Sequence, residues 1–247
     1  MKKLLFFVTL LCLSSVLMAA LPVTETFAGG TIVNTWEQFW TVDSTLTAVP
    51  NGTDGKTTPA ADGYFGKDEC VATGATTSGK ITGDFTDTSY TVEAYLYTPV
   101  YNTYTGFEAY HYQMLVFYRD SGGYGRLHAQ FNTFGGAIPA PRIRCQIANP
   151  SFVAPNPGAW TSPTNFTHSE GWHIFKIEIT GTVANCYYDT TLLGVADWTA
   201  TAATRTAGKF GFGQYMDDVG TGNLYVDEFK AYVPIPTSIK GDWTAYE

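Results

Sequence analysis

Apolar and polar residues alternate along most of the chain with the two-residue period of β-strands. From Tyr90 to Thr98 the alternation places Glu93, Tyr95 and Tyr97 on one face, opposite Val92, Ala94 and Leu96. Similar runs cover residues 112–119, 126–132, 142–147, 172–180, 183–189, 209–215 and 224–233. Turn sequences such as Asp120-Ser121-Gly122-Gly123 separate these runs. The pattern predicts an all-β protein, an antiparallel two-sheet sandwich.

Two stretches are less regular. Residues 29–88 contain Asn51-Gly52, Asp54-Gly55 and Asp62-Gly63, which mark tight turns, and we expect the first strands and long connecting loops there. Residues 135–167 are rich in Pro, Gly and Asn, and a loop of that length is often a binding element. Without a fixed repeat or a second hydrophobic nucleus, residues 21–233 are predicted to be one domain, followed by a short linker and tail at 234–247.

The first twenty residues have the pattern of an export signal. Lys2 and Lys3 precede an apolar run, and Met18-Ala19-Ala20 ends it with a small residue at the cut. The apolar run is too short for a membrane anchor, so we predict a signal peptide, residues 1–20, that is removed after Ala20. The mature chain is then expected to be secreted, extracellular or at the cell surface, with no membrane insertion after cleavage.

Composition narrows the class of partner. Hydrophobic residues make up 45% of the chain and charged residues 15%, which favours a folded core over disorder. The 14 basic and 22 acidic residues give a formal net charge of −8, with no basic cluster. This balance argues against nucleic acid and against anionic membranes as partners.

The cysteines leave two alternatives open. Cys12 falls in the signal peptide, and the remaining Cys70, Cys145 and Cys186 cannot all pair within one chain. Buried free thiols are the favoured prediction, and a Cys145–Cys186 bridge is the alternative. No pair of cysteines has the spacing of a metal site.

The order of several short motifs resembles the concanavalin A-like lectin and glucanase superfamily. The resemblance covers roughly residues 83–233, with Glu25-Thr26-Phe27 as a candidate first strand. The similar segments are Gly83–Ala94, Phe117–Asp120 with Tyr124, Gly171–Ile179 with Tyr187-Tyr188-Asp189, Gly208–Gly213 and Tyr225–Phe229. Thr190 departs from the pattern, because the family usually has glycine there, and a different turn is expected. The resemblance implies a laminin-G-like jelly roll, a fold that hosts lectins, adhesion modules, hydrolases and lyases alike.

Carboxylates are not arranged as catalysis on this fold would need. The related hydrolases carry E-x-D-x-x-E on one strand, whereas Glu93 is the only acid of its strand. Asp217-Asp218 and Asp227-Glu228 are adjacent pairs, and neighbours in a strand point to opposite faces. We interpret the first pair as part of a turn, and we expect the second pair to contain one buried, hydrogen-bonded acid. We therefore expect no catalysis, and a glycoside-active enzyme remains an alternative.

Metal binding rests on two acids. The four histidines are scattered and lack zinc spacing. Structural calcium is expected instead, because secreted jelly rolls often use carboxylates to hold their terminal strands. Glu25 on the opening strand and Asp227 on the closing strand are the predicted ligands, with a hydrogen bond to a loop amide as the alternative role of Asp227.

Planar side chains on the polar strand faces suggest a ligand site. Sugars stack their C–H faces on aromatic rings and leave hydroxyls for Arg, Gln, Asn and Asp. If three of the strands are neighbours, one patch forms from Tyr95, Tyr97, Arg126, His128, Gln130, Arg142 and Arg144. Trp160, in the long loop, is the next candidate. Three of the five arginines in this patch favour an anionic or hydroxyl-rich ligand, although an ordinary solvent-facing sheet has the same composition.

These patterns together predict a secreted, non-catalytic, lectin-like domain that binds a polysaccharide or another glycan. A structural or adhesive extracellular protein, capable of self-assembly, is a further alternative. The predicted core comprises Trp172, Phe175, Ile177, Phe210, Phe212 and Phe229.

Overall fold

The computed structural model describes residues 22–38, 44–73, 76–85, 89–98, 111–120, 123–130, 142–148, 169–197, 208–216 and 219–234. Within these residues the strands form two antiparallel sheets, and the helical elements are the short turns η1 (Ala28–Gly30) and η2 (Thr53–Gly55). No helix in this part of the chain is long and apolar enough to cross a bilayer. The predicted all-β sandwich is confirmed. The predicted signal peptide, Trp160 and most of the tail lie outside the described residues.

The larger sheet has eight described strands, and one strand organises it. β14 (Val219–Tyr232) pairs along one side with β6 (Ser89–Thr98) and along the other with β4 (Tyr64–Thr73) and β1 (Val23–Glu25). The sheet order is β12-β11-β10-β6-β14-β4-β3. Its remaining strands are β3 (Ser44–Pro50), β10 (Gly171–Thr180), β11 (Val183–Tyr188) and β12 (Thr191–Asp197).

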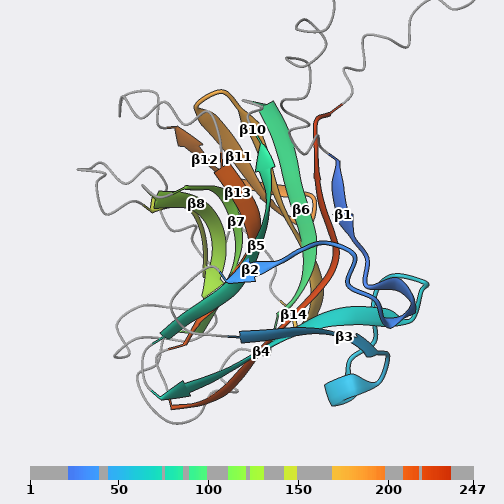
Figure 1. Ribbon diagram of the computed structural model, residues 1–247. Helices are drawn as coiled ribbons and strands as arrows, with labels where there is room; N and C mark the ends of the chain where they lie inside the picture. Colours follow the sequence, from blue (N-terminus) through green and yellow to red (C-terminus); the bar gives the residue numbers. More distant parts are fainter. Residues whose placement is uncertain are drawn as a thin grey trace, which may run out of the picture.

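The smaller sheet has six described strands in the order β2-β5-β13-β7-β8-β9. They are β2 (Glu37–Gln38), β5 (Thr76–Phe85), β7 (His111–Asp120), β8 (Gly123–Gln130), β9 (Arg142–Ala148) and β13 (Gly208–Met216). Figure 1 shows the two layers, with β6, β10 and β14 in one and β7, β8 and β13 in the other.

Alternation located the later strands well and the early ones poorly. Each of the eight patterned runs coincides with a strand, whereas β4 and β5, ten residues each, lie in the region 29–88 that looked irregular. These two strands contain glycines and inward-facing polar residues, which hide the two-residue period. β12 was also not predicted. It is the edge strand of the eight-stranded sheet, and Leu192 and Val195 there are about half exposed.

The core between the sheets is aromatic at its centre. Phe229 packs against Trp36, with ring centroids 5.2 Å apart, and against Phe210 and Phe212 at 5.9 and 6.0 Å. Five of the six predicted core residues are completely buried: Phe175, Ile177, Phe210, Phe212 and Phe229. Trp172 was predicted wrongly, because it is partly exposed and lies outside this cluster. It precedes Phe175 by three positions, and an odd separation in a strand puts two side chains on opposite faces.

Near β3, β4 and β5 buried polar groups replace the aromatic rings. Asp68 is completely buried; its Oδ2 accepts a hydrogen bond from Ser44 Oγ at 3.0 Å, and its Oδ1 has no partner among the described residues. Lys80 Nζ donates to Gln38 Oε1 at 2.8 Å and to the carbonyl of Ser44 at 2.6 Å. Burial raises the pKa of Asp68 to about 6, although Ser44 and the charge of Lys80 act in the opposite direction.

The cysteines divide into one free thiol and one bridge. Cys70 is buried and free, and burial raises the pKa of its thiol. Cys186 is disulfide-bonded, so the prediction of a free thiol there is wrong. The side chains of Cys12 and Cys145 lie outside the described residues, and Cys145 stays the predicted partner.

Candidate functional site

The outer face of the eight-stranded sheet carries aromatic side chains on four adjacent strands. Leu96 and Leu224 point into the core, so Tyr97 of β6 and Tyr225 of β14 point outward. Cross-strand pairing places Trp172 of β10 opposite Tyr97, and Lys67 of β4 opposite Tyr225. Strand order and register alone therefore bring these side chains together.

Four rings on this face form what we call the ring cluster: Phe65, Tyr97, Trp172 and Tyr225. The ring of Tyr97 packs edge to face against the ring of Trp172, with centroids 5.5 Å apart. It packs in the same way against the ring of Tyr225, with centroids 6.1 Å apart. Phe65 closes the set, at 5.5 Å from Trp172 and 5.9 Å from Tyr225. Phe65 and Tyr225 are buried, whereas Tyr97 and Trp172 stay partly exposed. The cluster thus has a covered base and an accessible side.

A loop, residues 51–63, packs beside the ring cluster and is fastened at several points. Trp172 Nε1 donates a hydrogen bond to the carbonyl of Thr57 at 2.6 Å. The hydroxyl of Thr58 donates to Asp227 Oδ2, and the amide of Thr58 donates to Asn51 Oδ1 at 2.7 Å. The amide of Asn51 donates to the carbonyl of Gly63 at 2.9 Å, which closes the loop at its base. The loop is therefore held as a fixed wall of the site.

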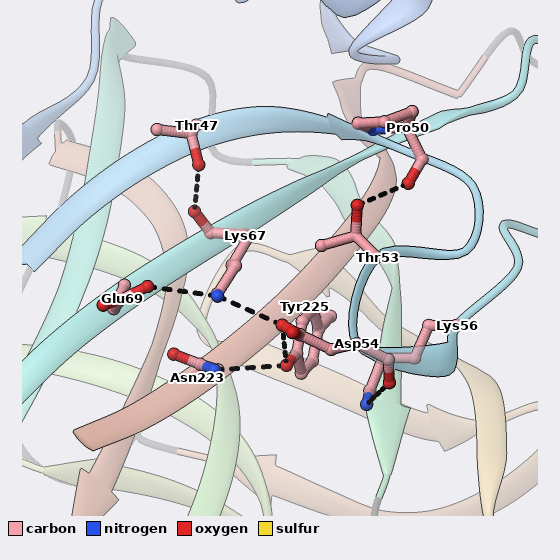
Figure 2. A network of polar contacts seen from close by, with 9 residues as sticks. All are labelled: Thr47, Pro50, Thr53, Asp54, Lys56, Lys67, Glu69, Asn223 and Tyr225. Atoms are coloured by element: carbon pink, nitrogen blue, oxygen red, sulfur yellow. Dashed lines mark hydrogen bonds and ion pairs between the residues drawn. The ribbon is translucent and has the colours of Figure 1, made fainter. Parts of the chain in front are cut away.

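A polar network surrounds Tyr225 (Figure 2). Its hydroxyl donates to Asp54 Oδ2 at 2.7 Å, and Lys67 Nζ lies 3.1 Å from Asp54 and 3.1 Å from Glu69. The hydrogen bonds from Tyr225 and Lys67 lower the pKa of Asp54. Burial alone would lower the pKa of Lys67, but its bonds to Asp54 and Glu69 outweigh burial and raise it. Asp54 is thus an ionised acceptor at the rim of the ring cluster.

Lys56 covers the two tyrosines of the cluster. Its Nζ lies 4.6 Å from the ring centre of Tyr97 and 4.3 Å from that of Tyr225, and it donates to the carbonyl of Asp54 at 3.1 Å. The hydroxyl of Tyr97 donates to Glu170 Oε1 at 2.9 Å. Burial and the neighbouring Glu170 carboxylate raise the pKa of Tyr97 to about 12.

The predicted ligand patch is not one surface. Tyr95 and Tyr97 belong to β6, in the eight-stranded sheet, whereas β8 and β9 belong to the six-stranded sheet. β8 and β9 do pair, and their register sets Arg126 opposite Gln146, His128 opposite Arg144, and Gln130 opposite Arg142. The assumption that all three strands are neighbours is therefore wrong. Alternation within one strand does not reveal which distant strand will pair with it.

Lys56, Trp172 and Tyr225 were missed as site residues. For Trp172 the signal was available, because its parity in β10 sets it opposite Phe175. Tyr225 could have been assigned to the outer face in the same way, from the buried Leu224 and Val226 beside it. The position of Lys56 depends on how the loop packs on the sheet, and no periodic pattern in the sequence encodes it.

The two predicted calcium ligands are separate structural acids. Glu25 is buried, and its carboxylate accepts hydrogen bonds from the amides of Phe27, Val33 and Asn34 and from the side chains of Asn34 and Trp36. A carboxylate surrounded by N–H donors does not fit a cation. The described residues contain no group of three or more His, Cys, Asp or Glu side chains that could hold a metal ion. Calcium stays an untested prediction.

Asp227 fastens the loop. Its carboxylate accepts a hydrogen bond from the Thr58 hydroxyl and another, at 2.8 Å, from the backbone amide of Glu228. This agrees with the alternative predicted from the sequence, a buried, hydrogen-bonded acid. Burial raises its pKa to about 6, against the effect of these two bonds. Asp68 has a similar pKa, and both acids are completely buried.

Ser169, His173 and Asp189 are arranged in a row that resembles a catalytic triad. His173 Nδ1 lies 2.9 Å from Asp189 Oδ2, and its Nε2 lies 3.3 Å from Ser169 Oγ. Nε2 is closer still, at 3.0 Å, to the carbonyl oxygen of Ser169, which can only accept. A triad needs Nε2 directed at the serine hydroxyl, whereas the shorter contact of Nε2 here is to the carbonyl oxygen of Ser169. Asp189 also accepts from the amide of Ile174 at 3.0 Å, so the row fastens a turn.

Comparisons with known proteins identify the fold. No family model and no curated protein matches the sequence. Among solved structures, a Crh5 transglycosylase in complex with NAG aligns at a TM-score of 0.52 and 13% identity, over 89% of this chain and 86% of its own. The chain has a jelly-roll sandwich fold.

Two further solved structures align with this chain. A GlcNAcα1-4Gal-releasing endo-β-galactosidase from Clostridium perfringens aligns at a TM-score of 0.50 and 13% identity, over 86% of this chain and 61% of its own. A carbohydrate-binding module, CBM66 from Bacillus subtilis, aligns at a TM-score of 0.47 and 11% identity, over 84% of this chain and 99% of its own. At the turn before Thr190, where a different turn was expected, Asp189 adopts the left-handed conformation with φ 52°.

Proposed function

We propose that this protein is exported and binds a glycan without chemical conversion, through the outer face of its eight-stranded sheet. The observation that carries the proposal is the ring cluster, whose Tyr97 and Trp172 are partly exposed and lie edge to face at 5.5 Å. Aromatic rings at a surface bind the C–H faces of sugars, and neighbouring polar groups bind the hydroxyls.

Polar groups of the required kind surround these rings. Asp54 and Glu170 are carboxylates that accept hydrogen bonds, and Lys67 is a donor. Fixed contacts from Trp172 to Thr57 and from Thr58 to Asp227 hold the loop in place before a ligand arrives. A preorganised site loses less conformational entropy on binding.

Two further considerations support this function. The transglycosylase and the endo-β-galactosidase that share the fold are, by their names, proteins that act on sugars. Catalysis is left out of the proposal because the sequence lacks the E-x-D-x-x-E pattern that hydrolases on this fold carry on one strand. Export rests on the predicted signal peptide of residues 1–20.

A glycan array on the chain without its first twenty residues tests the proposal. We expect at least one class of glycan to bind, and Tyr97→Ala and Trp172→Ala to weaken that binding at least fivefold. Tyr187→Ala is the matched control, because Tyr187 lies on the same sheet face at β11, outside the ring cluster. An array with no binder contradicts the proposal. Release of shorter sugars from the best binder would favour the enzyme, and concentration-dependent assembly without glycan binding would favour the structural alternative.

A further inference from the structure

Among the described residues Lys56, like Lys80, makes no ion pair with a carboxylate, and Lys56 lies over two aromatic rings as well. Lys67, Lys176, Lys209 and Lys230 each lie within ion-pair distance of a carboxylate. In the described part of the chain the ammonium of Lys56 instead contacts the rings of Tyr97 and Tyr225 and the carbonyl of Asp54, and its charge also lowers the pKa of the Asp54 carboxyl group. Two aromatic faces and one carbonyl oxygen are the elements of an ammonium-binding site.

The two tyrosine rings are prepared for a cation. The hydroxyl of Tyr97 donates to Glu170 at 2.9 Å, and that of Tyr225 donates to Asp54 at 2.7 Å. A hydroxyl that donates to a carboxylate polarises its ring toward greater electron density, which strengthens the attraction of the ring face for a positive charge. The same two carboxylates make the rim of the site negative.

The occupant is a side chain of the loop and can leave without the loop. The loop is fastened by Thr57, Thr58 and Asn51, none of whose bonds involves Lys56. Lys56 itself is partly exposed, and its long side chain has several alternative rotamers. Rotation of this one side chain would therefore uncover the ring faces of Tyr97 and Tyr225 that Lys56 now covers.

We infer that Tyr97 and Tyr225 form a binding site for an ammonium group, that Lys56 occupies it in the free protein, and that the ligand is a glycan of amino sugars with free, protonated amines. The inference rests on the proposed function and names its ligand class. An amino sugar replaces one ammonium by another and keeps both ring contacts. A neutral sugar has to displace Lys56 and leaves the electron-rich rings without a cation. The formal charge of −8 adds a general attraction for a cationic glycan.

The test is isothermal titration of the chain without its first twenty residues, at pH 5.5, with a glucosamine tetramer and with its fully N-acetylated counterpart. We expect the glucosamine tetramer to bind more tightly. Lys56→Gln removes the internal competitor and is expected to raise affinity for the glucosamine tetramer about two- to fivefold, the equivalent of one exposed cation–π contact. Tyr97→Ala is expected to abolish the preference for the free amine.

Lys176→Gln is the matched control. Lys176 lies on the same sheet face, with its Nζ 4.4 Å from the ring centre of Tyr187, and its removal changes the net charge equally. Once the change in net charge is corrected for, Lys176→Gln should leave the affinities for the glucosamine tetramer and for its N-acetylated counterpart unchanged. If Lys176→Gln and Lys56→Gln raise affinity alike, the attraction is nonspecific and the inference is wrong.

The remaining outcomes separate the inference from the proposed function. Equal binding of both tetramers, or weaker binding of both by Lys56→Gln, overturns the ammonium site but leaves glycan binding standing. Failure of both tetramers, together with binding of an uncharged glycan on the array, does the same. An array without any binder overturns both. Melting temperatures within about 3 °C of the parent chain establish that each variant is folded.

Discussion

The two faces of the eight-stranded sheet are built from the same strands by the same alternation, yet their polar groups differ. On the inner face of β6, β10 and β14, aliphatic and aromatic side chains fill the space between the sheets. On the outer face, rings are interleaved with lysines and carboxylates that bond to one another. The inner face thus supplies stability through burial, whereas the outer face offers directional groups to a ligand.

Two buried acids, one on each face of the sheet, depart from this division between an apolar inner face and a polar outer face. Asp68 and Asp227 are both completely buried acids with pKa values raised to about 6. Asp227, on the outer face, accepts bonds that fasten the loop, whereas Asp68, on the inner face, keeps one oxygen without a partner among the described residues. Burial shifts both acids alike, and their bonds decide what each one does.

The largest effect is expected on the inner face. Phe229→Ala should lower the free energy of unfolding by about 3–5 kcal/mol, because the ring is completely buried among Trp36, Phe210 and Phe212. Urea denaturation measures this loss. A change below about 1 kcal/mol would show that the ring does not have the core position described here.

The next effect concerns pH and Asp68. Because its pKa is about 6 in the folded chain and 3.8 as a reference, the folded state holds a proton that the unfolded state loses between these values. Stability should therefore fall as pH rises from about 4 to about 6, by about 3 kcal/mol for this one group. Asp68→Asn should remove that part of the fall and be more stable than the parent chain at pH 7.

Urea titrations of the parent chain and the variant at pH 4 and pH 7 measure this difference. Asp227→Asn is the companion variant, because it has a similar pKa but loses an acceptor that fastens the loop. A pH profile that Asp68→Asn leaves unchanged would contradict the assignment of this carboxyl group.

On the outer face the expected effect is on binding rather than on folding. Trp172→Ala should weaken glycan binding by about 1–3 kcal/mol, the range of a buried aromatic contact with a ligand, at a smaller cost in stability than Phe229→Ala. Arg144→Ala, in β9 of the other sheet, should leave affinity unchanged. Titration with the best array binder compares them. Loss of binding in Arg144→Ala alone would move the site to the six-stranded sheet.

The smallest effect is expected in the network around Tyr225. Lys67→Met should cost about 0.5–1 kcal/mol of stability, because Lys67 joins Asp54 to Glu69 but lies near the surface, where ion pairs contribute little. Thermal unfolding at low and high salt checks this value, since the difference from the parent chain should shrink with salt. A loss that salt does not change would point to packing of the lysine stem instead.

The sequence by itself determined the strand class, most later strands and the inner face, because the period of two is local and burial selects apolar side chains at every second position. The burial of Phe175 and Phe229 follows from that rule. The rule also predicts the partial exposure of Trp172, because Trp172 lies an odd number of positions from Phe175 in the same strand. Only the tertiary structure decided the rest. The pairing of β6 with β10 and β14, rather than with β8 and β9, joins segments more than seventy residues apart. The position of Lys56 over Tyr97 and Tyr225 depends on a loop that is hydrogen-bonded to that sheet. Contacts of this kind between distant segments leave no periodic pattern in the sequence.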